Sequence, residues 1–200
     1  MHVPILHAPS DMGSMGPALG AAYVERFGRR HWDQHLALLE GFWPAVGAAL
    51  EQLGLDYPRV LLYQDGLPVC GRELEIVKAA AAQGSANYQL LADLAGRGAT
   101  LLGTEDPRLL LEEYRQLQAA LRRERGAGPA ASPGTPAGPG TNLMAQRDAY
   151  IAARIGRSLG PQHTGILFLG MMHRIEALLP TDIVVTRVVP PILERLGPTG

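Results

Sequence analysis

Short apolar runs alternate with longer helix-like stretches along this chain, and that alternation restricts the fold more than any other feature. The runs with the length and composition of buried strands are Val3–His7, Arg59–Tyr63, Ala99–Gly103, Gly165–Leu169 and Asp182–Val189. Strands separated by helices predict βαβ units, which build parallel sheets. We therefore expect a three-layer α/β domain with a mainly parallel sheet of about five strands and helices on both faces.

The helix-like stretches carry recognisable start and stop signals. Trp32–Leu53 has apolar residues at helical spacing and stops at Gly54. Ser85 is placed to cap a helix over 86–95, and Pro107 suits the first position of a helix that runs to Arg125. Further helices are expected over 17–27, 71–82 and 142–158. The apolar face of Trp32–Leu53 fits either the core of the domain or the interface of a homodimer.

The segment at residues 126–141 reads GAGPAASPGTPAGPGT and contains no aromatic or large aliphatic residue. Such a composition cannot bury enough apolar surface to offset the entropy of ordering, so we expect a flexible Gly/Pro/Ala-rich loop. The chain after this segment has room for only about one helix, one strand and a short tail. The loop is therefore expected to be an insertion within a single domain that spans residues 1–200.

Composition narrows the partners and the location. The net charge is −1, which gives no bulk attraction to nucleic acid or to an anionic membrane. The single cysteine, Cys70, rules out a disulfide within the chain and suits a reducing compartment. Neither a signal peptide nor a membrane-spanning run is evident. We expect a cytoplasmic protein that binds neither nucleic acid nor membrane.

Groups capable of chemistry stand where the predicted strands end. They are His7, Asp65, Glu105 and His173. The carboxyl ends of parallel strands share one edge, where ligands bind, so these side chains are expected to converge there. Each also has a structural interpretation: the histidines could pack in the core or in a turn, and Asp65 precedes a glycine as in many tight turns.

Other polar residues near these strand ends are open to more than one interpretation. Thr104 or Asp106 would cap the helix that begins at Pro107, which leaves Glu105 as the available carboxylate. Glu73 lies early in a helix, where the helix dipole favours acids and where it could also act in catalysis. Arg147 could hold a carboxylate or phosphate in two parallel bonds, balance the acidic residues, or lie on a solvated helix face. For Asp148 a solvated helix face is expected.

Two histidines with several carboxylates form a reasonable ligand set for Zn²⁺ or Mn²⁺ with an open water position. The expected metal ligands are His7, Asp65, Glu105 and His173. The loop Asp11–Gly16 matches neither the GxGxxG dinucleotide fingerprint nor the GxxxxGK[ST] phosphate loop, so no nucleotide cofactor is expected. The chain also lacks the GxSxG sequence of serine hydrolases.

The stretch from Met144 to Val185 resembles the C-terminal part of the TraB/PrgY-like proteins, which are related to the TIKI proteases and more distantly to the erythromycin-esterase and ChaN-like proteins. The family pattern is an E-R-N-like helix, an apolar strand and then G-x-x-H. The counterparts here are Gln146-Arg147-Asp148, Gly165–Leu169 and Gly170-Met-Met-His173. The resemblance implies an active centre built from strand-end histidines and acids, with Arg147 and His173 among its residues.

Two functions are expected from these residues. The first is a metal-assisted hydrolase that cleaves a small ester, lactone or peptide bond, with His173, Arg147 and Glu73 as catalytic residues. The metal would lower the pKa of a bound water, and Arg147 would stabilise developing negative charge. The alternative is a non-catalytic regulatory domain that holds a small anionic ligand at the same edge.

Overall fold

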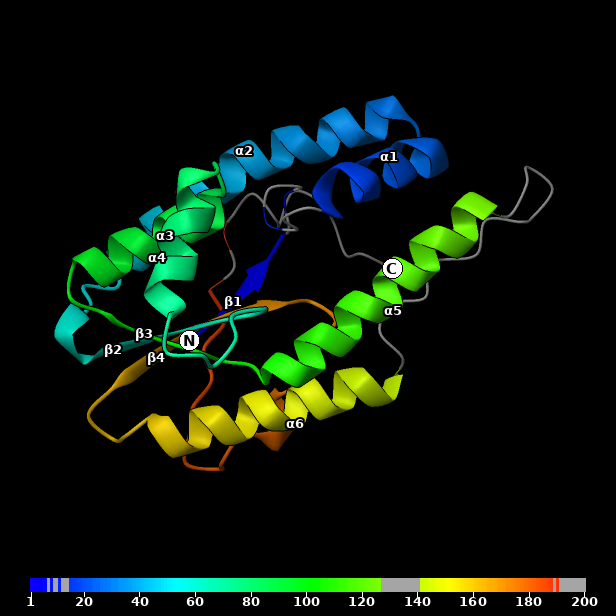
Figure 1. Ribbon diagram of the computed structural model, residues 1–200. Helices are drawn as coiled ribbons and strands as arrows, with labels where there is room; N and C mark the ends of the chain where they lie inside the picture. Colours follow the sequence, from blue (N-terminus) through cyan, green and yellow to red (C-terminus); the bar gives the residue numbers. More distant parts are fainter. Residues whose placement is uncertain (7, 9–10, 12–14, 127–140, 189, 191–200) are drawn as a thin grey trace.

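The computed structural model describes residues 1–6, 8, 11, 15–126, 141–188 and 190. Within this part of the chain it is an α/β structure in which six α-helices surround one parallel sheet (Figure 1). His7 and the interior of the loop expected at 126–141 lie outside the described residues. The division of the chain into one domain therefore stays a prediction.

The sheet is formed by four strands that are parallel throughout. They are β1 (His2–Ile5), β2 (Val60–Gln64), β3 (Thr100–Leu102) and β4 (Thr164–Gly170). Their order across the sheet is β1-β4-β2-β3, with Gln64 of β2 opposite Phe168 of β4. The parallel arrangement predicted from the sequence is confirmed, and all four strands end at the same edge.

A fifth strand at Asp182–Val189 does not form within the described part of this segment. One isolated parallel bridge joins Arg187 to His2, with the His2 amide donating to the Thr186 carbonyl at 2.8 Å. Val184 is 86% exposed, whereas Ile183 and Val188 pack against the apolar clusters, so the described part of the segment is partly buried but joins the sheet through that one bridge. It lies along the edge of β1 as extended chain, and the prediction of about five strands is corrected to four.

Four helices belong to one side of the sheet. They are α1 (Gly16–Phe27), α2 (Arg29–Glu51), α3 (Glu73–Ala82) and α4 (Ala86–Gly96). A buried apolar cluster joins Phe42 and Val46 of α2 and Leu91 of α4 to strand residues such as Leu62 and Phe168. The apolar face of α2 therefore packs into the core. This was one of the two roles expected for it, the other being a homodimer interface. Ser85 caps α4 as predicted, since its side chain accepts a bond from the Tyr88 amide.

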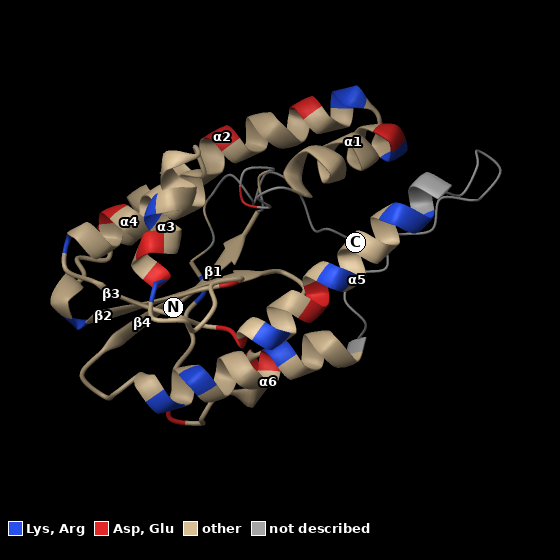
Figure 2. Cartoon of the chain, in the orientation of Figure 1, with Lys and Arg blue, Asp and Glu red and all other residues tan. Residues whose placement is uncertain are grey.

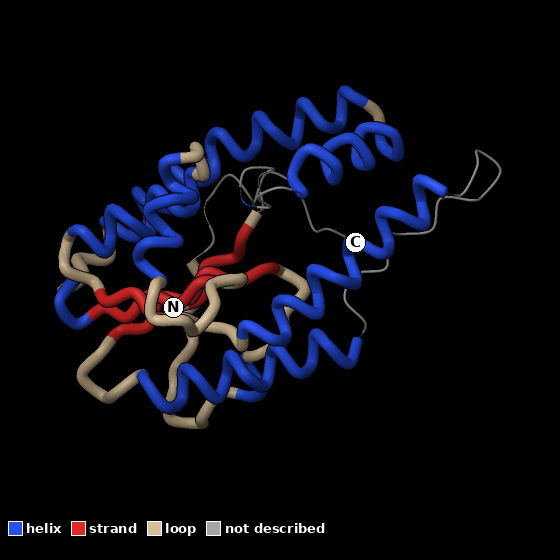
Figure 3. The backbone as a smooth tube through the Cα atoms, viewed as in Figure 1, coloured by secondary structure: helices blue, strands red, loops and turns tan. Residues whose placement is uncertain are grey.

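The opposite face is covered chiefly by α6 (Thr141–Ser158), with α5 (Pro107–Gly126) lying against α6 (Figure 3). Ile151 and Ile155 of α6 pack on Tyr63 and Leu167, which alternate along their strands with the residues that face α2 and α4. Helices thus cover both faces of the sheet. No helix in the described ranges is long and apolar enough to cross a membrane.

Candidate functional site

Polar side chains from three strand ends meet at the carboxyl edge of the sheet. Asp65 follows β2, Glu105 follows β3 and His173 follows β4, and all three lie against Arg147 and Asp148 of α6 or against each other. We call these five residues the edge cluster. The convergence predicted for Asp65, Glu105 and His173 therefore occurs. Figure 2 shows the acidic and basic segments of α5 and α6 lying next to the sheet at this edge.

Arg147 is the centre of the edge cluster and is only 4% exposed. Its guanidinium holds Glu105 in two bonds of 2.6 Å each, one from Nε and one from Nη2. Nη2 also donates to Asp65 Oδ1 at 2.8 Å, and Nη1 donates to Glu113 of α5 at 2.5 Å. Paired planar bonds of this kind are the strongest that a guanidinium makes with a carboxylate. Arg147 thus balances the acidic residues, which was one of its expected roles.

His173 lies between two carboxylates. Its Nδ1 is 2.5 Å from Asp148 Oδ1, and its Nε2 is 3.4 Å from Asp65 Oδ2. The side chain is 3% exposed. Asp148 Oδ2 also accepts the Arg174 amide at 2.9 Å, so Asp148 holds both the ring and the backbone of this turn. A short 3₁₀ helix follows this turn at Glu176–Leu178.

The electrostatics of the edge cluster follow from its burial. Burial alone would lower the pKa of His173, but Asp65 and Asp148 outweigh it and raise that pKa above 6.5. For Asp65, burial opposes ionisation, yet His173 and Arg147 hold its pKa well below the ordinary 3.8. Burial and the nearby Asp65 raise the pKa of Glu105, although Arg147 opposes them. His173 is thus protonated more readily than a free histidine.

The backbone also bonds to these carboxylates. The Gly170 amide donates to Asp65 Oδ2 at 3.0 Å, and the Gly66 amide donates to Glu105 Oε1 at 2.8 Å. Asp106 caps α5 through the Arg108 amide at 2.8 Å, so Glu105 is the acid of this turn that enters the cluster, as expected.

Glu73 is not joined to the edge cluster by any contact between described side chains. Its carboxylate accepts the amides of Cys70 and Gly71 at 2.9 and 3.1 Å. Burial would raise its pKa, but these amide bonds and Arg154 lower it. Glu73 therefore stabilises the turn before α3, and its predicted catalytic role has no support from its position.

Asp148 was assigned to a solvated helix face, and this was wrong, since it is 5% exposed and bound to His173. A signal was present in the sequence: Asp148 lies three and four residues before Ile151 and Ala152, which are buried on the same side of α6. The partnership of Glu113 with Arg147 was also missed, because no local pattern links α5 to α6.

Of the four expected metal ligands, His7 lies outside the described residues, so the binding of a divalent ion stays a prediction. The guanidinium of Arg147 already lies between Asp65 and Glu105, where a cation would have to bind. Both nitrogens of His173 face carboxylates, Nδ1 facing Asp148 and Nε2 facing Asp65, so a metal at Nε2 would displace the contact with Asp65. No group of three or more His, Cys, Asp or Glu side chains in the described ranges is arranged as a metal site.

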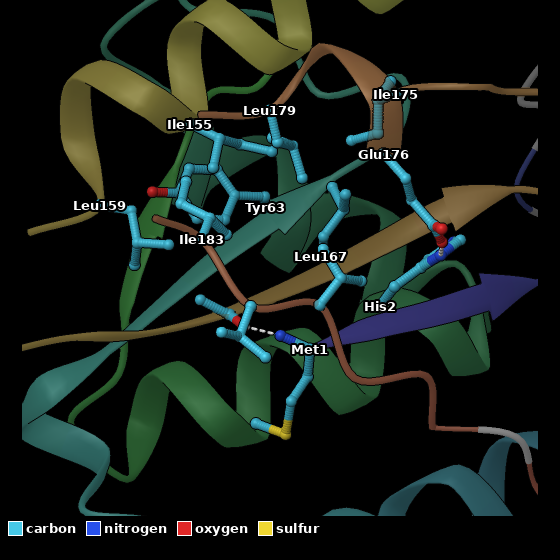
Figure 4. Close-up of a pocket in the computed structure, with 13 residues that line it drawn as sticks. Met1, His2, Tyr63, Ile155, Leu159, Leu167, Ile175, Glu176, Leu179 and Ile183 are labelled. Atoms are coloured by element: carbon cyan, nitrogen blue, oxygen red, sulfur yellow. Dashed lines mark hydrogen bonds and ion pairs between the residues drawn. The ribbon is translucent and has the colours of Figure 1, made fainter. Parts of the chain in front are cut away.

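An apolar cavity lies away from the edge cluster, between α6, the sheet and the segment after β4 (Figure 4). Its volume is about 40 Å³, and its lining includes Tyr63, Ile155 and Leu179. Cavities that bind small molecules are usually several hundred cubic ångströms. This one has room for little more than water, so it is not a substrate site.

Comparisons with protein-family models, with curated proteins and with solved structures find no match to this chain. The resemblance to the TraB/PrgY-like proteins stays a prediction that rests on its own residues.

Proposed function

We propose that this chain is a hydrolase that works by acid–base chemistry at the carboxyl edge of its sheet, with His173 as the group that transfers the proton. The observation that carries the proposal is the pair formed by Asp148 and His173 Nδ1 at 2.5 Å. A carboxylate on Nδ1 fixes the orientation and tautomer of an imidazole, so that Nε2 is the nitrogen that exchanges protons. Nε2 lies 3.4 Å from Asp65 Oδ2.

In this proposal the neutral ring of His173 accepts a proton at Nε2 from a water molecule, while the water oxygen bonds to the carbonyl carbon of the substrate. Nε2 then donates that proton to the leaving oxygen or nitrogen as its bond to carbon breaks. Asp148 stabilises the imidazolium that exists between the two steps. Positioned proton transfer of this kind contributes about 10²- to 10⁴-fold to a rate.

Arg147 is a positioning residue in this proposal and does not bind the substrate. Its bonds to Glu105, Asp65 and Glu113 hold the acids of the cluster in place. A role in stabilising charge on the substrate would require Arg147 to release carboxylates that are themselves buried, which is unfavourable.

The alternative, a regulatory domain that binds a small anion, has less support because of charge. Asp65, Glu105, Glu113 and Asp148 contribute −4 when ionised, and Arg147 with protonated His173 contributes +2, so the sum is −2. Protonation of Glu105 alone would leave the sum at −1. A negative surrounding repels an anion and favours a neutral or cationic ligand.

The resemblance to the TraB/PrgY-like proteins also supports a hydrolase, because Arg147 and His173, the residues that match the family pattern, are both members of the edge cluster. The substrate classes remain small esters, lactones and peptide bonds. A zinc or manganese ion has weaker support, since Arg147 takes the place that such an ion would need.

The test is hydrolysis of a panel of aryl esters, lactones and short peptides by the purified protein, with His173→Gln and Asp148→Asn beside it. The matched control is His163→Gln, because His163 is exposed and outside the cluster. We expect activity on part of the panel that falls at least about 100-fold in His173→Gln and is unchanged in the control. Full activity in His173→Gln, or none on any substrate by the native protein, contradicts the proposal. Loss of activity on chelation, with stoichiometric metal, would favour the metal-assisted alternative.

A further inference from the structure

Buried amide groups without partners lie on the α2 and α4 side of the sheet. Asn87 is fully buried, yet neither its Nδ2 nor its Oδ1 has a hydrogen-bond partner among the described residues. Gln64 is 1% exposed, and its Oε1 is also unpaired there, while its Nε2 donates to the Asp65 carbonyl at 3.0 Å. Buried side-chain amides in folded proteins nearly always bond to protein or to ordered water. Two such residues therefore present polar atoms that either ordered water or a bound ligand has to satisfy.

Both residues lie at the carboxyl edge of the sheet, next to the edge cluster. Gln64 is the last residue of β2 and immediately precedes Asp65. Along β2 it alternates with Val60 and Leu62, which belong to the apolar cluster on the side of α2 and α4, so its side chain faces that side. Asn87 lies in the first turn of α4.

The first turn of α4 is held at this edge by the residue that caps it. The Ser85 hydroxyl donates to Asp11, in the segment that follows β1. Burial raises the pKa of Tyr88, the residue after Asn87, to about 12, with Asp11, Asp65 and Glu105 adding to the effect. Tyr88 thus lies within the electrostatic reach of the edge cluster, and Asn87 is its neighbour in the chain.

A third unpaired group on the same side completes the set of donors and acceptors. Trp43 of α2 is 4% exposed, and its Nε1 has no partner in the described part of the chain. Its ring centroid is 6.4 Å from that of Phe168, the residue opposite Gln64 in the sheet. The unpaired donors are therefore Asn87 Nδ2 and Trp43 Nε1, and the unpaired acceptors are Asn87 Oδ1 and Gln64 Oε1.

We propose that Asn87 and Gln64 form a subsite for an uncharged amide of the substrate, so that the hydrolase acts on peptides or other carboxamides in preference to esters and lactones. This inference rests on the function proposed above and names its substrate class. Asn87 Nδ2 donates to the carbonyl oxygen of the amide, and Asn87 Oδ1 or Gln64 Oε1 accepts its N–H. An ester or lactone has no N–H, so it would leave the buried acceptors unpaired, and sites of that kind discriminate strongly.

The charge of the edge supports an uncharged ligand. The carboxylates Asp11, Asp65 and Glu105 all act on Tyr88, whereas a carboxylate on the ligand would meet their repulsion. A free amine on the ligand is compatible with this surrounding. Peptides with an N-terminal amine or an internal amide near the cleaved bond therefore fit better than anionic metabolites.

Binding is tested without any dependence on catalysis. N-acetylalanine methylamide and N-acetylalanine methyl ester are titrated into the native protein, and binding is followed by the shifts of backbone amide NMR signals. The same titrations are made with Asn87→Leu and with Asn87→Asp, which keeps the shape but removes the donor. Thermal unfolding of each variant without ligand shows whether it is folded.

We expect the methylamide to bind about 10-fold more tightly than the ester, as one added neutral hydrogen bond provides. Asn87→Leu should lose that preference and unfold at the same or a higher temperature, because the unpaired amide is removed. Equal binding of both probes, or binding of neither, overturns the subsite. A clear fall in the melting temperature of Asn87→Leu also overturns it, since it would show that Asn87 is satisfied by water in a structural role.

These results are separable from the hydrolase proposal. If the methylamide binds selectively but His173→Gln retains full hydrolytic activity, the subsite stands and the role of His173 fails. If His173→Gln loses activity while both probes bind equally, the reverse holds.

Discussion

Arg147→Met is the substitution that tests the edge cluster most directly. It keeps most of the length and volume of the arginine stem and removes the guanidinium, which makes four bonds of 2.5–2.8 Å to Glu105, Asp65 and Glu113. Removing one partner of a buried ion pair costs about 3–5 kcal/mol, because the remaining charge stays buried. The loss in the free energy of unfolding depends on which other hydrogen-bond partners each carboxylate keeps.

Removal of the guanidinium would not destabilise the three carboxylates equally. Glu113 is 26% exposed and can regain water. Asp65 keeps the Gly170 amide at 3.0 Å and His173 at 3.4 Å. Glu105 is 1% exposed, loses both of its bonds to the guanidinium, and keeps the Gly66 amide and a side-chain bond with Asp65. The loss therefore falls mainly on Glu105, and we expect the free energy of unfolding to drop by about 3 kcal/mol, the lower end of the range.

The measurement is urea unfolding followed by circular dichroism at pH 7, with the denaturant slope checked for constancy. The double variant Arg147→Met with Glu105→Gln should recover more than half of the loss, because the buried charge is removed with its partner. The matched control is Arg59→Met, since the ion pair of Arg59 with Asp56 has both side chains more than 60% exposed. A drop below about 1 kcal/mol in Arg147→Met, or no recovery in the double variant, would refute the reasoning.

Three further outcomes are expected. Because folding raises the pKa of His173 above 6.5, the stabilisation from His173 is complete below pH 6.5 and is lost as the pH rises through the raised pKa. Because folding lowers the pKa of Asp65 below 3.8, the stabilisation from Asp65 is present above pH 3.8 and is lost as the pH falls through the lowered pKa. Urea unfolding measured across pH should show this loss of stability at high pH in the native protein and not in His173→Gln. A loss of equal size in both proteins would contradict the assignment to His173. Ser85→Ala should destabilise by about 1–2 kcal/mol in urea unfolding, since it removes the cap of α4 and the bond to Asp11, and an unchanged midpoint would contradict that role. Ile151→Ala, at a fully buried position of α6, should cost about 2–5 kcal/mol by the same assay, whereas Ala149→Gly on the same helix serves as a control for backbone effects of about 1 kcal/mol.

Much of the fold could be predicted from local patterns. The parallel sheet was predictable because apolar runs and helical spacing alternate, and the meeting of Asp65, Glu105 and His173 was predictable from the edge that parallel strands share. The segment at 182–188 was assigned to a strand because its β-branched residues fit one, and Val184 is exposed while Ile183 is partly buried, but its described part makes only one bridge, to His2.

The partnerships inside the site were harder to predict. That Arg147 would neutralise Glu105 and Asp65 depends on how α6 lies against two strand ends that are far from it in sequence. Asp148 could have been assigned to the buried face of α6 from its spacing to Ile151 alone. The unpaired amides of Asn87 and Gln64 carry no sequence signal, since only packing decides whether an amide meets a partner.

The edge cluster also determines how this part of the molecule opens. The amides of Gly66 and Arg174 lie outside helices and strands, and that of Gly170 lies at the end of β4, where hydrogen exchange with solvent is ordinarily fast, yet each donates to a carboxylate of the cluster. Their exchange then requires release of those carboxylates and of α6 with them. The ends of β2, β3 and β4 and the first turns of α6 are thereby one cooperative unit, whose turn amides exchange together at the rate at which the cluster separates.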